Sequence, residues 1–217
     1  MIGGNKNVFW EALILTVFVF LLGMLFGVAY ENSKINEIEQ YYKSSELDLN
    51  DIFVFNDLIE FKNISCQNLI DRNIEFANKI YEEALLLEKY EDAGKINENM
   101  KIEHKKYDLL RTFLWINTIK TREICKEDIT TVVYLYEYET ENLVQKATQN
   151  VWSKILLDLK KEKGNEIILI PIAVNTEIIS INALTKKFEI NDYPALVIND
   201  KTVLTELKNI NSIKIHL

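Results

Sequence analysis

An uncharged apolar run from Ala12 to Ala29 sets the first limit on how this chain can fold. Together with the apolar residues at its edges, the run reaches the roughly 20 residues that a helix needs to cross ~30 Å of hydrocarbon. We therefore predict a short tail over residues 1–7, followed by a transmembrane helix over residues 8–30. The protein is expected to be a single-pass membrane protein.

The same run has a second interpretation, as a signal peptide that is removed by cleavage. Gly27 and Ala29 are small residues at the two positions that a signal peptidase reads. Against cleavage, the run is longer than the usual apolar segment of about 7–15 residues, and few positive charges precede it. An uncleaved anchor is therefore favoured.

Lysines on the two sides of the run are too evenly balanced for charge to decide the orientation. We expect the N-terminus in the cytoplasm and the C-terminal domain on the extracytoplasmic face, because the two cysteines suit an oxidising compartment. Within the run, Gly23 and Gly27 form a GxxxG pattern, which lets two helix backbones approach closely in lipid. A homodimer packed through these glycines is one expected assembly, and a chance match is the alternative.

Composition limits the partners of the remaining chain. Lys+Arg 25 against Asp+Glu 33 gives a formal net charge of −8, which argues against nucleic acid as a partner. His104 and His216 are the only histidines, and neither lies near a cysteine in the sequence, so we predict no metal site and no cofactor. His104 stands among charged residues and is expected to be a solvated helix position.

Residues 31–128 are predicted to form a helical stalk and an antiparallel helical hairpin. Apolar residues recur at helical spacing from Ile35 to Leu47, as expected if the spanning helix continues as an amphipathic stalk. Asp48 and Asn50 are residue types that favour helix starts, and they predict a separate short helix that extends to Phe61.

Two long apolar stripes at helical spacing predict the arms of the hairpin. The first stripe lies between Gln67 and Glu91, and the second between Ile96 and Ile124. Gly94 supplies a permissive backbone for the turn between them.

The chain has 2 cysteines, Cys66 and Cys125, and one falls at each outer end of this hairpin. Because an antiparallel hairpin brings those ends together, we predict a disulfide that closes a long loop and stabilises the fold by about 4 kcal/mol. The alternative is two unrelated buried thiols in a reducing compartment. Asn63 begins an N-x-S glycosylation pattern beside Cys66, for which a chance match is at least as good an explanation.

The C-terminal half changes from helical spacing to short runs rich in β-branched residues. Residues 129–136 and 166–174 are predicted strands, and residues 141–163 are a predicted helix that stops at Gly164. A strand, a helix and a strand of this length imply a parallel pair joined by a right-handed crossover. Pro171 places the second strand at an edge or at a bulge.

The remaining elements are predicted as a short helix over residues 180–188, a strand, a hairpin turn, a second strand and a weak helix over residues 207–212. This order, together with the segment from Phe188 to Ile198, resembles the thioredoxin fold over about residues 129–217. The resemblance implies an α/β domain with a cis peptide bond between Tyr193 and Pro194. With Ala195, these residues form the candidate groove at the substrate-facing end of the sheet.

The chain departs from the thioredoxin pattern where that family places its two cysteines. The segment from Glu137 to Asn142 contains three glutamates and no cysteine. The thiolate that would attack a disulfide is missing, so no catalytic residue is predicted by the family mechanism. The glutamates are expected to be solvated near the start of the following helix, and a new acid–base site is the less favoured alternative.

The favoured hypothesis is a membrane-anchored, non-catalytic protein that binds a polypeptide or a membrane-complex partner through this groove. The alternative is a membrane-bound thiol–disulfide oxidoreductase that uses Cys66 and Cys125 as its redox pair. A third hypothesis makes the hairpin the docking face and the C-terminal domain a cap.

Overall fold

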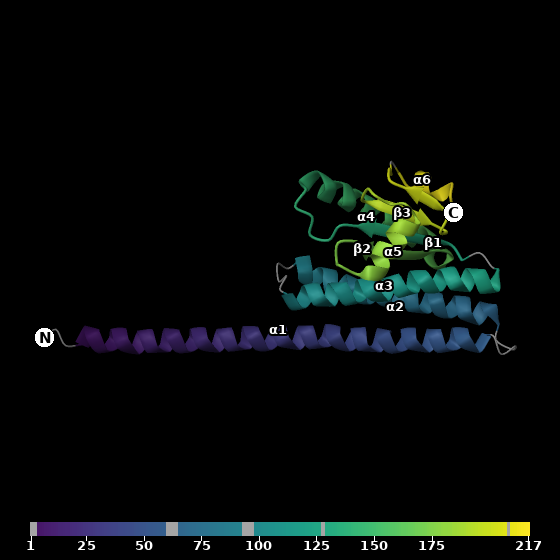
Figure 1. The fold of residues 1–217 in the computed structure, drawn as a ribbon. Coiled ribbons are helices and arrows are strands. Elements are labelled where there is room, and N and C mark those ends of the chain that lie inside the picture. The colour runs from purple at the N-terminus through teal and green to yellow at the C-terminus, as the bar shows by residue number, and fades with distance from the viewer. Residues whose placement is uncertain (1–3, 60–64, 93–97, 127–128, 208) are drawn as a thin grey trace. The chain divides into compact units, whose positions relative to one another are not determined.

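The computed structural model describes residues 4–59, 65–92, 98–126, 129–207 and 209–217 (Figure 1). The chain forms two compact units, Met1–Tyr41 and Tyr42–Leu217. The glycosylation pattern at Asn63 and the turn at Gly94 lie outside the described residues.

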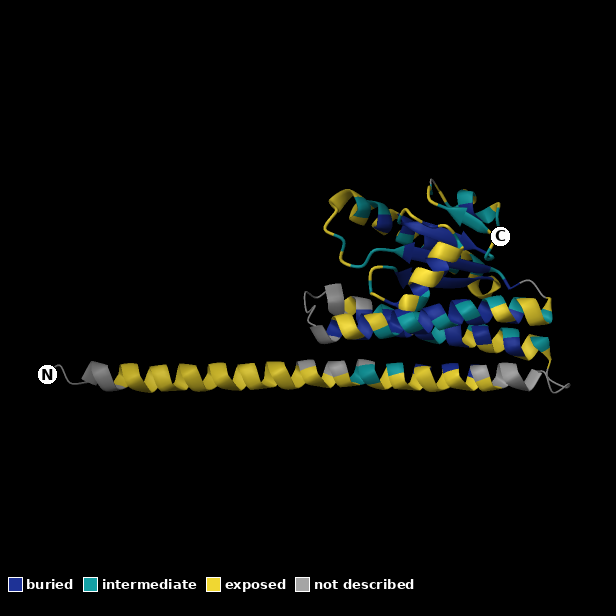
Figure 2. Ribbon diagram, in the orientation of Figure 1, coloured by how far each residue is buried: buried dark blue, intermediate teal, exposed yellow. Residues whose placement is uncertain are grey.

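The first unit is made by the N-terminal part of helix α1 (Gly4–Ile59). The stretch Val8–Tyr30, 23 residues, is long and apolar enough to cross a membrane. All side chains of this stretch are exposed (Figure 2). A Cβ added at Gly23 or Gly27 would meet no atom within 4 Å, which leaves room for another helix. The predicted apolar helix is confirmed, and its orientation stays a prediction.

The predicted helix start at Asp48 and Asn50 is wrong, because α1 continues through both residues. Within the second unit, Ser45, Leu49 and Ile52 recur at helical spacing and are all buried. The Asp48 carboxylate accepts a hydrogen bond from Lys79 and does not cap a helix. Burial of one continuous face outweighs the local preference of these residues for a cap.

Helices α2 (Cys66–Asp92) and α3 (Glu98–Cys125) form the predicted antiparallel hairpin. A disulfide joins Cys66 to Cys125 across a sequence separation of 59, with the two Cα atoms 5.6 Å apart. The predicted stripes supply much of the hairpin core, but its interior is also polar. Asn117 donates a hydrogen bond of 2.6 Å to the buried side chain of Asn73, which in turn donates to Thr121.

The C-terminal part contains a mixed sheet of four strands in the order β2-β1-β3-β4. Strands β1 (Thr131–Tyr136) and β2 (Ile168–Ala173) are parallel, while β3 (Ala195–Ile198) runs antiparallel to β1 and to β4 (Thr202–Leu204). The predicted strands and the parallel pair are confirmed. Pro171 lies in β2, which is an edge strand, as its missing N–H predicts.

Helix α4 (Leu143–Lys163) connects the parallel strands and continues into the short 3₁₀ helix η1 (Gly164–Glu166). Asn142 caps its start by accepting hydrogen bonds from the backbone N–H groups of Val144 and Gln145. Gly164 ends it with a φ of 54°, a left-handed conformation that glycine adopts without a steric cost.

Helices cover both faces of the sheet, and the sheet itself is buried (Figures 1 and 2). On one face, Trp152, Leu156 and Leu159 of α4 pack against alternate residues of β1, β2 and β3. Ile213 of helix α6 (Asn211–Lys214) joins the same core, although the helix begins later than predicted. Helix α5 (Ile179–Lys187) lies between β2 and β3 in the chain, close to its predicted range. The described chain is thus mostly helical with a small mixed sheet.

Candidate functional site

The predicted groove and the cysteine-free turn lie at the same edge of the sheet, where β1 and β2 end and β3 begins. Leu135 pairs with Ala195, so the end of β1 lies beside the start of β3. Asn175, which follows β2, accepts a hydrogen bond from the Tyr138 N–H and donates one to the Tyr138 carbonyl, each 2.8 Å long. The loops after β1 and β2 are therefore tied to each other at this end of the sheet. We call this end of the sheet, together with the loops that follow β1 and β2, the strand-end surface.

The candidate groove residues differ in exposure. The peptide bond between Tyr193 and Pro194 is cis. Tyr193 is half-buried, whereas Pro194 and Ala195 are buried. Strand pairing of β3 with β1 begins at Ala195, so Tyr193 precedes the ladder. Of the three predicted residues, Tyr193 is the one that a partner can reach.

Apolar side chains at two helix starts add to the strand-end surface. Leu143 and Val144 open α4, Ile179 opens α5, and all three are exposed, with Ile179 86% accessible. The buried residues of α4 begin at Gln149, so these first residues of the helix do not enter the core.

Glutamates surround these apolar residues. Glu139 and Glu177 are exposed and have φ angles of 50° and 57°, a backbone region that non-glycine residues seldom occupy. Such conformations are held by the surrounding structure and cluster at functional sites. In the turn, the Glu137 N–H donates to Gln149 and the Glu137 carbonyl accepts from the same amide, at 2.8 and 3.0 Å. These bonds fix the turn through its backbone and leave the carboxylates to face solvent or a partner.

Within the described residues, no group of three or more histidine, cysteine, aspartate or glutamate side chains could hold a metal ion. The strand-end surface presents exposed apolar side chains and exposed glutamates.

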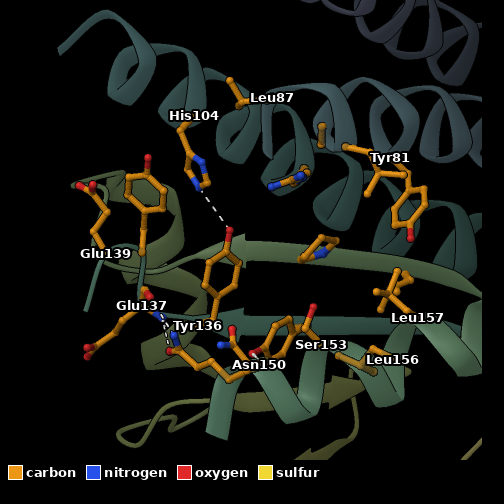
Figure 3. Close-up of a pocket in the computed structure, with 18 of the residues that line it drawn as sticks. Tyr81, Leu87, His104, Tyr136, Glu137, Glu139, Asn150, Ser153, Leu156 and Leu157 are labelled. Atoms are coloured by element: carbon orange, nitrogen blue, oxygen red, sulfur yellow. Dashed lines mark hydrogen bonds between the residues drawn. The ribbon is translucent and has the colours of Figure 1, made fainter. Parts of the chain in front are cut away.

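A second site is a cavity of about 320 Å³ that sequence patterns did not predict (Figure 3). It lies between α2 and α3 on one side and β1, β2 and α4 on the other. Its lining includes four tyrosines and several polar side chains, namely Tyr81, Tyr134, Tyr136, Tyr138, His104, Arg111, Lys146, Gln149 and Ser153.

His104 lines this cavity, and the expectation that it is solvated is wrong, because its side chain is 6% exposed. Figure 3 shows the ring directed at the Tyr136 hydroxyl, which lies 3.2 Å from Nε2. The ring also stacks on Tyr138, with the centroids 3.8 Å apart. The prediction relied on the charged residues beside His104 in the sequence. Lys105 lies on the exposed side of α3, however, whereas His104 faces the sheet.

Asp108, one helical turn after His104, is fully buried behind the cavity. Its Oδ1 accepts hydrogen bonds from the Ala173 N–H at 3.1 Å and from Arg111 at 3.3 Å. Its Oδ2 lies 3.5 Å from His104 Nε2, close enough for an ion pair but without a formed hydrogen bond. Burial raises the pKa of this carboxyl above its usual value, and the nearby His104 and Arg111 oppose that shift.

Arg111 lines the cavity and is only 7% exposed. Its Nη1 donates to Asp108, and among the described residues we find no partner for Nε or Nη2. His104, Asp108 and Arg111 recur at helical spacing on one face of α3, which is a signal that the sequence carries.

Comparisons with protein-family models, with curated proteins and with solved structures find no match for this chain.

Proposed function

We propose that this protein is a membrane-anchored, non-catalytic module that binds another polypeptide on the extracytoplasmic face. Its C-terminal domain, residues 129–217, is proposed to be thioredoxin-like. The order of elements from β1 through α4, β2, α5, β3 and β4 to α6, with strand order β2-β1-β3-β4, supports that relationship. The observation that carries the function is the exposure of three apolar side chains, Leu143, Val144 and Ile179, at the two helix starts that follow β1 and β2.

Exposed apolar residues gathered at one end of a sheet favour a protein partner. Tyr193 lies at the same end and presents backbone before the strand ladder begins, where an extended segment can align. Glu139, Glu141 and Glu177 are exposed around it, so a partner segment with apolar residues flanked by lysine or arginine complements the surface.

The cysteines support a structural role over a redox role. Both belong to the bridge between the hairpin ends, and the chain contains no further cysteine. The cysteine-free turn at the strand ends has no sulfur with which to attack a substrate disulfide. Under this proposal the bridge holds the helices, and the sheet end holds the partner.

Site-specific photo-crosslinking in native membranes tests the proposal. A photoreactive phenylalanine analogue replaces Val144, which is 77% exposed, or Ile215, which is also 77% exposed. Ile215 adjoins His216, whose carbonyl accepts from Asn199 near the start of β1, so it reports on the opposite end of the sheet. We expect a discrete crosslinked protein from position 144 and none from position 215.

Charge substitutions then test whether the contact is functional. Ile179→Asp should abolish the crosslink from position 144, and Ile215→Asp should leave it intact. Equal crosslinking from both positions, or none from position 144, would contradict the proposal.

A further inference from the structure

The cavity beside the hairpin plays no part in the proposed docking of a polypeptide at the strand ends. Its volume of about 320 Å³ falls at the lower end of the range of roughly 300–1,000 Å³ that small-molecule sites occupy. Tyr81, Tyr136 and Leu156 supply much of its wall, with flat or branched apolar surfaces. Figure 3 shows these side chains reaching it from α2, β1 and α4. The cavity can enclose a compact molecule with an apolar body.

Arg111 gives the cavity a polar anchor. Its guanidinium is buried and donates through Nη1 to Asp108, while Nε and Nη2 have no partner within the described residues. These two nitrogens form one edge of the planar group, with parallel N–H bonds whose spacing matches the two oxygens of a carboxylate. A carboxylate that accepts both N–H bonds forms charge-assisted hydrogen bonds, which are stronger than hydrogen bonds between neutral groups.

The charged side chains near Arg111 also favour a particular ligand charge. Lys146 also lines the cavity and has no ion-pair partner among the described residues. Glu137 and Glu139 also line the cavity. Figure 3 shows their side chains directed away from Tyr136 and Ser153, and the Glu139 carboxylate lies 3.8 Å from Lys101. Asp108 behind Arg111 is buried, so a dianion such as a phosphate would be repelled more strongly than a monoanion.

We propose that this cavity binds a compact organic carboxylic acid, with its carboxylate on the free edge of Arg111 and its flat apolar body between Tyr81, Tyr136 and Leu156. His104 and Asp108 position the anchor, since Asp108 holds Nη1 and so turns the opposite edge of the guanidinium toward the ligand. The proposal does not depend on the polypeptide partner, because Arg111, Tyr81 and Leu156 lie outside the strand-end surface, although Glu137 and Glu139 belong to both sites.

Binding of matched aromatic probes to the full-length protein in detergent micelles tests this site. Benzoate, benzamide, benzamidine and phenyl phosphate share one ring and differ in charge, and calorimetry measures their affinities. We expect benzoate to bind at least about tenfold more tightly than benzamide, because a hydrogen bond to a charged group is replaced by a neutral one. Benzamidine and phenyl phosphate should bind more weakly than benzoate.

Two variants and a control locate the binding. Arg111→Gln should weaken benzoate binding at least about tenfold, whereas Arg72→Gln, at an exposed arginine of α2 that pairs with Glu75, should not change it. Ser153→Phe fills the cavity from α4 without touching the Asp108–Arg111 pair, and it should abolish binding of every probe.

Three results would overturn the proposal. They are the absence of benzoate binding to the wild type, tighter binding of benzamidine or phenyl phosphate than of benzoate, and unchanged benzoate affinity in Ser153→Phe. If Arg111→Gln does not fold, the probe series and Ser153→Phe decide the question on their own.

Discussion

The hairpin and the sheet of the second unit are both well buried, yet they are held together by different interactions. The sheet core is almost entirely apolar, with Val133, Leu135 and Ile172 fully buried. The hairpin instead encloses an amide pair, Asn73 and Asn117, and is closed by a disulfide. Apolar burial thus specifies the sheet, whereas the hairpin combines apolar burial with matched polar groups in its interior.

The largest expected effect tests the hairpin. Replacing both cysteines by serine removes the constraint on a loop of 59 residues, and we expect a loss of about 4 kcal/mol in the free energy of unfolding. Chemical denaturation of the full-length protein in micelles measures it. Titration of the wild-type protein against glutathione reports the potential of the bridge, and reduction near about −200 mV would support the oxidoreductase hypothesis over a structural bridge.

A slightly smaller effect is expected from the apolar core of the sheet. Leu135→Ala deletes a fully buried side chain of the central strand β1 and should cost about 3 kcal/mol. Leu47→Ala, at an exposed position of α1, is the control and should cost less than about 0.5 kcal/mol. If Leu135→Ala lowers the free energy of unfolding no more than Leu47→Ala does, apolar burial does not specify the sheet.

The polar interior of the hairpin should respond next. Asn117→Ala leaves the buried Oδ1 of Asn73 without its donor, and we expect a loss of about 2 kcal/mol. Replacing both asparagines by leucine should cost less than the sum of the two single leucine changes, because neither amide is then left without the other as its partner. A double-mutant cycle measures this difference, and strict additivity would show that the amide pair does not act as a unit.

A weaker effect, visible as a change with pH, is expected at the buried carboxyl of α3. Burial raises the pKa of Asp108, so the folded protein holds this proton more tightly than the unfolded chain. The contribution to stability is therefore present at low pH and is lost as pH rises through the folded pKa. In Asp108→Asn this decline should disappear, whereas Asp71→Asn, at an exposed residue of α2, should keep it.

The smallest effect is expected at a surface ion pair. Lys79 pairs with Asp48, and both side chains are partly exposed. Asp48→Asn should therefore change the free energy of unfolding by less than about 1 kcal/mol. A larger loss would mean that this contact, and not apolar burial, holds α1 to the hairpin.

Much of the fold could be predicted because each element repeats a simple period. The β-branched runs predicted β1 and β2, the stripes predicted α2 and α3, and the positions of Cys66 and Cys125 predicted the bridge. The helix start predicted at Asp48 and Asn50 was wrong, because packing over a long helix face outweighs a local capping preference that is worth about 1 kcal/mol. The helix preferences of single residues do not show which face of a helix will be buried against another element.

The sites were less predictable than the fold. The cysteine-free turn and Tyr193 could be placed by resemblance, but the exposure of Ile179 depends on where α5 begins. The cavity needs His104 and Tyr136 to meet across 32 positions of sequence, which no local pattern encodes. The spacing of His104, Asp108 and Arg111 on one helix face was a usable signal, hidden by the charged residues between them.

The edge strand β2 has a consequence for chains crowded together in a bilayer. The N–H groups of Ile168 and Val174 point to β1, so those of the odd-numbered positions between them point outward. Pro171 has no N–H to offer, and that of Ala173 is taken by Asp108. Of the three outward positions only Leu169 keeps a free backbone donor for another strand, so this side of the sheet is a poor template and association of neighbouring copies along it is disfavoured.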